Sequence, residues 1–199
     1  MQNYLYGAGG HSKVVIDAMQ IAQIDCAGFI DDKDNFTWLG FPVFKIDSLV
    51  NQEATYLHIA IGDCKAREYI AAKLRYVKFF NVVHPTAILA KTAQIGLGTF
   101  LAANSIVAAD ARVGNHCIIN HAAVVDHDCI VSDFCHISPQ SCLGGGVKLG
   151  KGVLIGAGAI VLPNIIIADY AVIGAGAVVI KNVAAGVTVV GNPAKLIKD

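Results

Sequence analysis

The stretch that decides the fold runs from Ala87 to Asn182 and divides without a gap into sixteen segments of six residues: AILAKT, AQIGLG, TFLAAN, SIVAAD, ARVGNH, CIINHA, AVVDHD, CIVSDF, CHISPQ, SCLGGG, VKLGKG, VLIGAG, AIVLPN, IIIADY, AVIGAG and AVVIKN. The third residue is Ile, Leu or Val in all sixteen, and the first is mostly Ala, Ser, Thr or Cys. A fixed period of this kind indicates a repeat architecture.

The six-residue period predicts a parallel β-solenoid. First and third residues lie two apart, so they point to the same side of a short strand and fill its interior. Three such edges close one triangular coil of about eighteen residues. The small fourth residue is expected to allow the tight turn, with unusual dihedral angles. An α-helical array is excluded, because six-residue spacing does not keep one helical face and β-branched residues dominate.

The first half of the chain predicts a small α/β domain with parallel strands. We expect strands at 3–6, 26–30, 40–44, 57–61 and 78–82, and helices at 12–22 and 65–76. The chain therefore divides into an α/β domain, 1–86, and a solenoid domain, 87–199. Because open solenoid ends need covering, the α/β domain is expected over one end and residues 183–199 over the other.

A glycine loop in the first domain suggests a nucleotide site. Residues 7–12, GAGGHS, lie between the first strand and the first helix, where backbone N–H groups can face a phosphate. Asp31 and Asp32 end the next strand and could hold hydroxyl groups. The fingerprint is imperfect, since Ser12 takes the third glycine position, and a plain tight turn is the alternative. A domain this small favours a mononucleotide or nucleotide-sugar over NAD.

Composition narrows the class of protein. Lys plus Arg and Asp plus Glu each number 15 in 199 residues, which argues against a nucleic-acid partner or a polybasic membrane-binding surface. A hydrophobic content of 55% excludes disorder. Glycines, Pro163 and Asp169 interrupt the most apolar stretch, so no membrane span is expected. The start of the chain lacks signal-peptide features, and the six cysteines lack metal-ligand spacing, which predicts a cytoplasmic protein with reduced thiols.

The polar cluster of the repeat lies at Asn120-His121, 126–128 (Asp-His-Asp), Asp133 and His136. His127 is a fifth residue of its segment and His136 a second residue, so both should point outward. Because they are nine residues apart, which is half a coil, we expect them on neighbouring regions of the prism surface. A cleft between two neighbouring prisms could bring such groups together. His127 between two carboxylates is a candidate general base, and a solvated surface histidine is the alternative.

Three thiols, Cys117, Cys129 and Cys135, are first residues of their segments. We expect them to be buried and structural rather than nucleophilic. Cys142 is a second residue with no evident base beside it, so an acyl-enzyme is not favoured.

Five motifs carry a family resemblance: GAGGHSKVV, FIDD, IAIGD, VVDHDCIVSDFCHISP and GNPAK. Together they resemble the nucleotide-sugar N-acetyltransferases of the PglD type, which are hexapeptide-repeat transferases, over essentially the whole chain. The sialic acid O-acetyltransferases of the NeuD type share this architecture. The resemblance implies that the β-helix is left-handed, that acetyl-CoA is the co-substrate with no metal, and that the protein is a homotrimer with active sites between subunits.

The resemblance also implies roles for individual residues. His127 would be the general base and Asp128 its partner, where the bacillosamine-pathway relatives carry Glu. The nucleotide-sugar would be held by Gly9, Gly10, His11, Asp31, Asp32, Gly62 and Asn120. Acetyl-CoA would be held by His136 near the thioester, by the main chain at Ala157 and Ala175, and by Gly191, Pro193 and Lys195 near its nucleotide end.

The expected activity is acetyl transfer to the amine of a nucleotide-linked amino sugar, first of all UDP-4-amino-4,6-dideoxy-N-acetylglucosamine. A GDP- or dTDP-linked amino sugar and a sialic acid hydroxyl are alternatives. A zinc enzyme like the γ-class carbonic anhydrases is an outsider, since His116 and His121 have the right separation but no third ligand lies at the expected place. A non-catalytic binding module is a further alternative.

Overall fold

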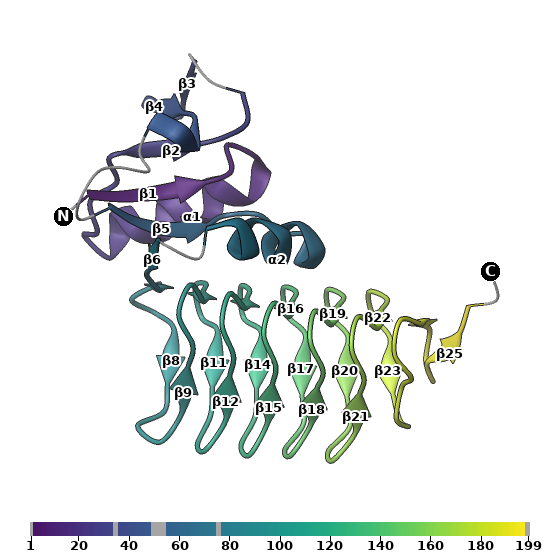
Figure 1. The fold of residues 1–199 in the computed structure, drawn as a ribbon. Coiled ribbons are helices and arrows are strands. Elements are labelled where there is room, and N and C mark those ends of the chain that lie inside the picture. Colours follow the sequence, from purple (N-terminus) through teal and green to yellow (C-terminus); the bar gives the residue numbers. More distant parts are fainter. Residues whose placement is uncertain (1, 34–35, 49–54, 75–76, 198–199) are drawn as a thin grey trace.

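The structure, a computed structural model, describes residues 2–33, 36–48, 55–74 and 77–197. An α/β domain lies along one side of an extended β-helix (Figure 1). Among the described residues, no helix is long and apolar enough to cross a membrane.

The α/β domain is built on one six-stranded sheet with the order β3-β4-β2-β1-β5-β6. Its elements are β1 (Gln2–Tyr6), α1 (Gly10–Ile21), β2 (Gly28–Ile30), β3 (Thr37–Trp38), β4 (Phe41–Phe44), the 3-10 turn η1 (Ile46–Ser48), β5 (Thr55–Ile59), α2 (Cys64–Lys73) and β6 (Lys78–Phe79). All pairs are parallel except β3 with β4, which confirms the predicted parallel character. The last two residues of the predicted helix 65–76 lie outside the described residues.

Two-residue strands form the three faces of the β-helix. Face 1 consists of β7 (Val82–Val83), β10 (Phe100–Leu101), β13 (Ile118–Ile119), β16 (His136–Ile137), β19 (Leu154–Ile155) and β22 (Val172–Ile173), continued by β24 (Thr188–Val190) and β25 (Lys195–Leu196). Face 2 consists of β8 (Ile88–Leu89), β11 (Ile106–Val107), β14 (Val124–Val125), β17 (Cys142–Leu143), β20 (Ile160–Val161) and β23 (Val178–Val179). Face 3 consists of β9 (Gln94–Ile95), β12 (Arg112–Val113), β15 (Ile130–Val131), β18 (Lys148–Leu149) and β21 (Ile166–Ile167).

Successive coils pair in parallel, and residue i lies opposite residue i+18, as Phe100 lies opposite Ile118 and Ile118 opposite His136. This confirms the predicted repeat. The first and third residues of the segments form one continuous core. Cys117, Cys129 and Cys135 are at most 1% exposed within it, as expected of structural thiols. Burial raises the pKa of Cys129 to about 11, so that thiol stays protonated.

The turns differ from the prediction. The left-handed backbone conformation falls on the sixth residue of the segment rather than the fourth, at Asn104, Asp110, His116, Ala122, Asp128, Phe134, Gln140, Asn164 and Tyr170 and at several glycines in the same column. Glycine at the fourth position has another cause, namely close approach of the next coil. A Cβ on Gly156 would stand 2.5 Å from the backbone nitrogen of Ala175, and one on Gly96 would stand 2.6 Å from that of Asn115.

The expected place of the α/β domain is also wrong, because the domain covers a side of the β-helix and not its open end. The outward side chains of Val82, Phe100 and Ile118 on face 1 are at most 1% exposed and share a core with α1 and β1. Leu89, which points to the interior in the first coil, stays 40% exposed. The apolar outer side of face 1 at these three positions gives the domain a surface to bury.

At the other end, the chain from Val183 onward packs on the last coil. Strand β24 pairs in parallel with β22, and β25 folds back antiparallel to it. Val183 and Val189 are each 8% exposed and join the core of the β-helix.

Candidate active site

His127 lies at the corner between faces 2 and 3, where β14 ends and β15 has not begun. Its ring Nδ1 is 2.8 Å from Oδ2 of Asp128, and its backbone N–H donates to Oδ1 of Asp126 at 2.7 Å. The hydrogen bond with Asp128, followed by the charge of Asp126, raises the pKa of His127 above its ordinary value. With the Nδ1 proton held by a carboxylate, Nε2 is left to accept a proton, as a general base requires.

Space for the His127 ring depends on the next coil. Gly145 occupies the same corner position eighteen residues later, and a Cβ there would stand 2.5 Å from Cε1 and Nε2 of the imidazole. Any other residue would push the ring away. Gly145 is not predicted from the sequence, although its eighteen-residue spacing from His127 is a usable signal.

His136 lies on face 1, beneath the α/β domain, with both ring nitrogens bonded. Nδ1 is 3.0 Å from the carbonyl oxygen of Gly62, and Nε2 is 3.1 Å from Nδ2 of Asn120. A carbonyl only accepts, so Nδ1 carries the proton and Nε2 accepts from the amide. Burial lowers the pKa of His136 to about 4 despite the Gly62 contact, which keeps the ring neutral.

His127 and His136 do not lie on neighbouring regions within one chain, contrary to expectation. In a triangular cross-section, the corner between faces 2 and 3 is opposite face 1. His136 therefore faces the α/β domain, whereas His127 belongs to the turn between β14 and β15, and the turns between faces 2 and 3 lie at the edge farthest from that domain (Figure 1). Nine residues carry the chain past face 3 and around a further corner.

The glycine loop has open space beside it. Gly9 precedes α1 with no side-chain capping bond, and added Cβ atoms at Gly9 and Gly10 would meet nothing within 4 Å. The first N–H groups of a helix have no partner within the helix, so this open helix start is suited to an anion. The two predicted acidic residues make different contacts. Asp31 accepts a hydrogen bond from the backbone N–H of Ala8, which belongs to the glycine loop, at 2.8 Å. Asp32 instead lines an adjacent groove of about 670 Å³.

That groove lies between the ends of β1, β5 and α2. It is lined by Tyr6, Asp32, Ile46, Asp47, Ile61, Ala66, Tyr69, Ile70, Lys73 and Leu74. The Tyr6 hydroxyl is 3.4 Å from Oδ1 of Asp32, and burial together with that carboxylate raises the pKa of Tyr6 to about 12. Tyr6 stays a hydrogen-bond donor at any physiological pH.

His11, predicted to hold the nucleotide, points toward the β-helix. Its ring packs edge-on to Phe100, with centroids 5.7 Å apart, and lies 6.1 Å from the His136 ring. Burial lowers its pKa to about 3, so it is a neutral ring in the interface between the domains. Gly62, also predicted, meets the same cluster through its carbonyl oxygen.

Ala157 and Ala175, two of the residues predicted to hold acetyl-CoA, lie at the corner between faces 1 and 2, whereas His136 lies on face 1 itself. His121, Ala157 and Ala175 are spaced by multiples of eighteen, so they form one column along that corner, and Asn120 lies at its head. The predicted C-terminal residues lie farther along. Pro193 and Lys195 help to line a mostly apolar cavity of about 420 Å³ between β23 and the β24–β25 hairpin, and Gly191 adopts a φ of 92°.

Metal-binding clusters of three or more His, Cys, Asp or Glu do not occur among the described residues. His116, the first candidate zinc ligand, is held between aromatic rings. It stacks on Phe134 with centroids 5.2 Å apart and meets the edge of Phe79 at 4.5 Å.

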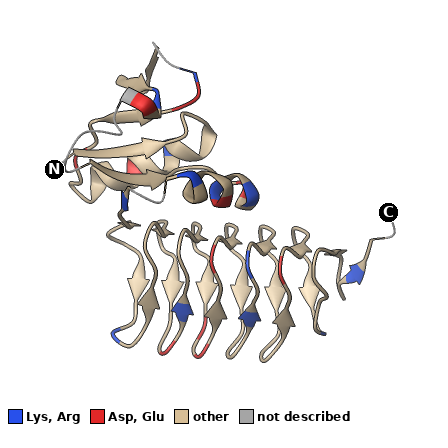
Figure 2. Cartoon of the chain, viewed as in Figure 1, with Lys and Arg blue, Asp and Glu red and all other residues tan. Residues whose placement is uncertain are grey.

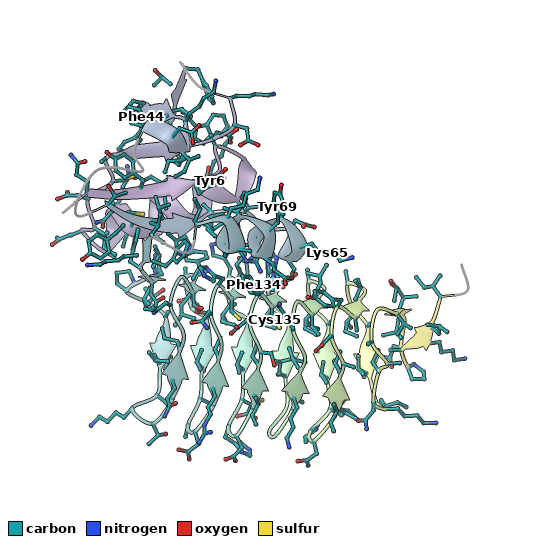
Figure 3. All side chains as sticks on the ribbon, viewed as in Figure 1. Tyr6, Phe44, Lys65, Tyr69, Phe134 and Cys135 are labelled. Carbon is teal, nitrogen blue, oxygen red and sulfur yellow. The ribbon has the colours of Figure 1, made fainter. Side chains whose placement is uncertain are left out.

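Charged residues lie along α2, the helix beside the β-helix (Figure 2), and two of them join the two domains. Glu68 accepts from the Tyr170 hydroxyl at 3.0 Å and pairs with Lys151 at 2.5 Å. Arg67 is 1% exposed and reaches the β-helix backbone, near Phe134 and Cys135 under α2 in Figure 3. No motif marks these residues, and only the docking of α2 reveals them.

Comparison with known proteins gives family matches for both halves of the chain. Residues 4–74 match the PglD N-terminal domain, and residues 146–181 match the bacterial transferase hexapeptide of six repeats. Among curated proteins, UDP-N-acetylbacillosamine N-acetyltransferase of Bacillus subtilis is 37% identical over 109 residues, which cover 50% of each chain. An uncharacterized protein of Acanthamoeba polyphaga mimivirus matches over only 21% of its length. The chain thus spans half or less of the curated relatives that it matches.

Solved structures match over the whole length. Perosamine N-acetyltransferase from Caulobacter crescentus, as a histidine-to-asparagine mutant with CoA and GDP-perosamine, is 34% identical, with a TM-score of 0.96 over 100% of this chain and 98% of that one. The acetyltransferase domain of PglB from Neisseria gonorrhoeae, with acetyl coenzyme A, is 32% identical, with a TM-score of 0.92 over 98% of both. This chain therefore belongs to the PglD family of hexapeptide-repeat acetyltransferases.

Proposed function

We propose that this protein transfers the acetyl group of acetyl-CoA to the amine of a nucleotide-linked amino sugar, with His127 as the general base. The observation that carries the proposal is the His127–Asp128 pair. Nδ1 of His127 is 2.8 Å from a carboxylate oxygen of Asp128, and the His127 side chain is 61% exposed at the corner. A base of this kind contributes about 10²- to 10⁴-fold in rate.

The reaction proceeds by direct attack. The neutral sugar amine adds to the thioester carbonyl, forming the C–N bond, and Nε2 of His127 takes the amine proton. Collapse of the tetrahedral oxyanion, stabilised by a backbone N–H, breaks the C–S bond. The CoA thiolate leaves and takes up the proton, so the imidazole returns to its starting state. Asp128 favours the imidazolium that forms in between.

The nucleotide-sugar would occupy the groove beside Asp32. Diphosphate oxygens would face the free N–H groups at Gly9 and Gly10, and Asp32 would hold hydroxyl groups, with Asp31 fixing the loop from behind. Both a UDP sugar and a GDP sugar satisfy these contacts. The Bacillus relative is named after a UDP-linked sugar, and the Caulobacter structure contains GDP-perosamine. UDP-4-amino-4,6-dideoxy-N-acetylglucosamine is the first substrate to test.

Acetyl-CoA would lie along the corner between faces 1 and 2. Its thioester would be near Asn120 and His136, its pantetheine arm along Ala157 and Ala175, and its nucleotide end at the C-terminal cavity with Gly191, Pro193 and Lys195. The support is the column that Ala157 and Ala175 form along this corner, with Asn120 at its head and the C-terminal cavity farther along.

The site would be completed by a second copy of the chain, in a homotrimer. Face 2 presents only apolar or thiol side chains outward, from Ile88, Ile106, Val124, Cys142, Ile160 and Val178. Ile88 and Ile160 are 58% and 45% exposed in one chain. The α/β domain covers face 1 at Val82, Phe100 and Ile118, and face 3 carries Arg112 and Lys148 among its isoleucines. Face 2 is therefore the uniformly apolar side left for a neighbour. Such packing would bring His127 of one copy toward the acetyl-CoA column of another.

Sialic acid O-acetylation is the second candidate, since a hydroxyl acceptor needs the same base chemistry. The open glycine loop favours the nucleotide sugar, because free sialic acid has no diphosphate to place there. The chemistry of the product distinguishes them: hydroxylamine cleaves an acetyl ester and leaves an acetyl amide intact.

The test is an acetyl-transfer assay read by mass spectrometry, with acetyl-CoA and, in separate reactions, the UDP-linked amino sugar, GDP-perosamine, a dTDP-linked amino sugar and free sialic acid. We expect a gain of about 42 daltons, stable to hydroxylamine, on one nucleotide-linked amino sugar. Transfer to sialic acid alone, or no transfer by protein that binds acetyl-CoA, would contradict the proposal. His127→Ala protein is the matched control for uncatalysed transfer.

A further inference from the structure

Arg67 lies on α2 with its guanidinium fully inside the interface between the domains. Nε donates to the carbonyl of His116 at 2.8 Å. Nη2 donates to the carbonyls of Phe134 at 2.8 Å and Cys135 at 3.2 Å. These carbonyls belong to two successive coils, so one side chain fixes α2 to the β-helix.

The same guanidinium also holds the loop that follows β5. Nη1 donates to the carbonyls of Ile61 at 2.8 Å and Gly62 at 3.0 Å. Among the described residues, no carboxylate pairs with Arg67, and its oxygen partners are all backbone carbonyls. A buried cation is costly unless its donors are satisfied, and a rigid five-donor fork is suited to an array of carbonyls in a way that lysine is not.

The Gly62 carbonyl connects Arg67 to the candidate site, because it is hydrogen-bonded to both Arg67 and His136. It accepts from Nη1 of Arg67 and from Nδ1 of His136, which uses both of its lone pairs. His136 Nε2 then accepts from Nδ2 of Asn120, whose Oδ1 accepts from the backbone N–H of His121 at 2.9 Å. One continuous set of hydrogen bonds thus runs from α2 to the corner between faces 1 and 2.

We propose that Arg67 is a positioning residue for the acetyl transfer: by fixing the Gly62 carbonyl, it sets the tautomer of His136 and, through it, the orientation of the Asn120 amide. The role rests on the proposed function, since Asn120 and His136 matter as site residues only if acetyl transfer occurs there. The other neutral tautomer would carry its proton on Nε2, toward Nδ2 of Asn120, and two donors would then face each other.

The electrostatic surroundings agree with a neutral His136. Burial and the nearby Arg67 charge both lower its pKa, whereas the Gly62 carbonyl acts against them. Besides burial, the nearby charges that lower the pKa of His11 are those of His136, His58, Arg67 and His121. His58 is itself held neutral by burial, with Nδ1 3.1 Å from the Phe80 carbonyl.

The first experiment needs no substitution. In protein labelled with ¹⁵N-histidine, His136, assigned by its loss in His136→Gln protein, is expected to show a protonated Nδ1 and an unprotonated Nε2 throughout pH 5.5–8. An Nε2–H tautomer, or protonation within that range, would overturn the proposal. Because this readout requires no turnover, it stands even if no substrate is acetylated.

The second experiment compares Arg67→Met and Arg67→Lys with Glu68→Gln as the matched control. Glu68 ties α2 to the β-helix through Tyr170 and Lys151 without touching Gly62. We expect Arg67→Met to populate both His136 tautomers and to lower kcat at least about tenfold with little change in the KM for acetyl-CoA. Arg67→Lys should be intermediate, and Glu68→Gln should match the wild type.

Two results would contradict the assignment. One is a folded Arg67→Met or Arg67→Lys protein with an unchanged His136 tautomer. The other is Glu68→Gln protein with the same losses, which would indicate general loosening of the interface. If Arg67→Met does not fold, the His136 tautomer in Arg67→Lys protein, compared with the wild type, tests the proposal by itself. Failure of wild-type protein to acetylate any substrate, with the tautomer as expected, would reject the proposed function and leave the hydrogen-bond chain intact.

Discussion

The corner at His127 and the interface at His136 place the same residue type in opposite environments. His127 is 61% exposed and paired with Asp128, which raises its pKa. His136 is surrounded by the α/β domain, has both ring nitrogens bonded, and has its pKa lowered to about 4. A general base needs a free nitrogen that can reach the substrate proton, so of these two histidines the corner one fits the proposed role. The interface histidine is suited to orienting neighbours.

The largest effect should come from removing the corner imidazole. His127→Ala is expected to lower turnover by about 100-fold or more, because proton removal from the amine is lost, while acetyl-CoA and nucleotide-sugar still bind. Steady-state kinetics and calorimetric titration of each substrate measure the two parts. Near-wild-type turnover of the purified variant would remove His127 from the mechanism.

Next in size is the effect of a charge on face 2. Ile160→Asp should weaken self-association at least about thirtyfold, because an unpaired carboxylate would be buried in the proposed interface. Sedimentation velocity over a concentration series measures this. The matched control is Ile166→Asp on face 3, where an isoleucine of similar exposure (49% against 45%) holds the equivalent place. Equal effects from both variants, or none from Ile160→Asp, would refute face 2 as the contact.

Asp128→Asn should lower turnover about tenfold, because the imidazolium loses its carboxylate partner. The hydrogen bond with Asp128 is the first cause of the raised His127 pKa, so its loss lowers that pKa. The base form of His127 then persists to lower pH, and the acidic limb of the pH–rate profile moves down. Asp110→Asn, one coil earlier in the same left-handed position, is the control and should change neither quantity. An acidic limb that does not move would mean that Asp128 does not control the pKa of the general base.

The smallest expected effect is that of Gly145→Ala, a decrease in kcat of about threefold or more, because the new methyl group would stand 2.5 Å from the His127 ring. A double-mutant cycle with His127→Ala measures the coupling. In the His127→Ala background, the methyl group should have no further effect on turnover. An equal loss in both backgrounds would mean that the corner backbone, and not the ring, is disturbed.

The parts of the fold that repeat could be predicted from the sequence, and so could the His127–Asp128 pair, because both depend on short-range spacing. The face covered by the α/β domain could not, since Val82, Phe100 and Ile118 appear in the sequence as ordinary outward residues of a strand. The position of the left-handed residue was also misassigned. Glycine at the fourth position indicated a turn, whereas the cause is contact with the next coil.

Prediction of the candidate site was limited in the same way. The pair Asp31 and Asp32 is a single signal in the sequence, but one carboxylate closes the loop and the other faces the groove. Arg67 and Glu68 lie on a helix with no motif, and their partners in the β-helix are 49 to 102 residues away in the chain. Contacts at such separations come from domain docking, which local patterns do not encode.

The uninterrupted eighteen-residue register has a consequence for the length of substrate that the protein can hold. Each coil adds one strand spacing, about 4.8 Å, along the prism axis. Duplicating one coil between Val147 and Ile165 would preserve every pairing rule and yet move the C-terminal cavity one spacing farther from Asn120. Acetyl-CoA bound as proposed would then be too short to reach both ends. The number of coils between the head of the column and the hairpin would thus act as a molecular ruler for the acyl donor.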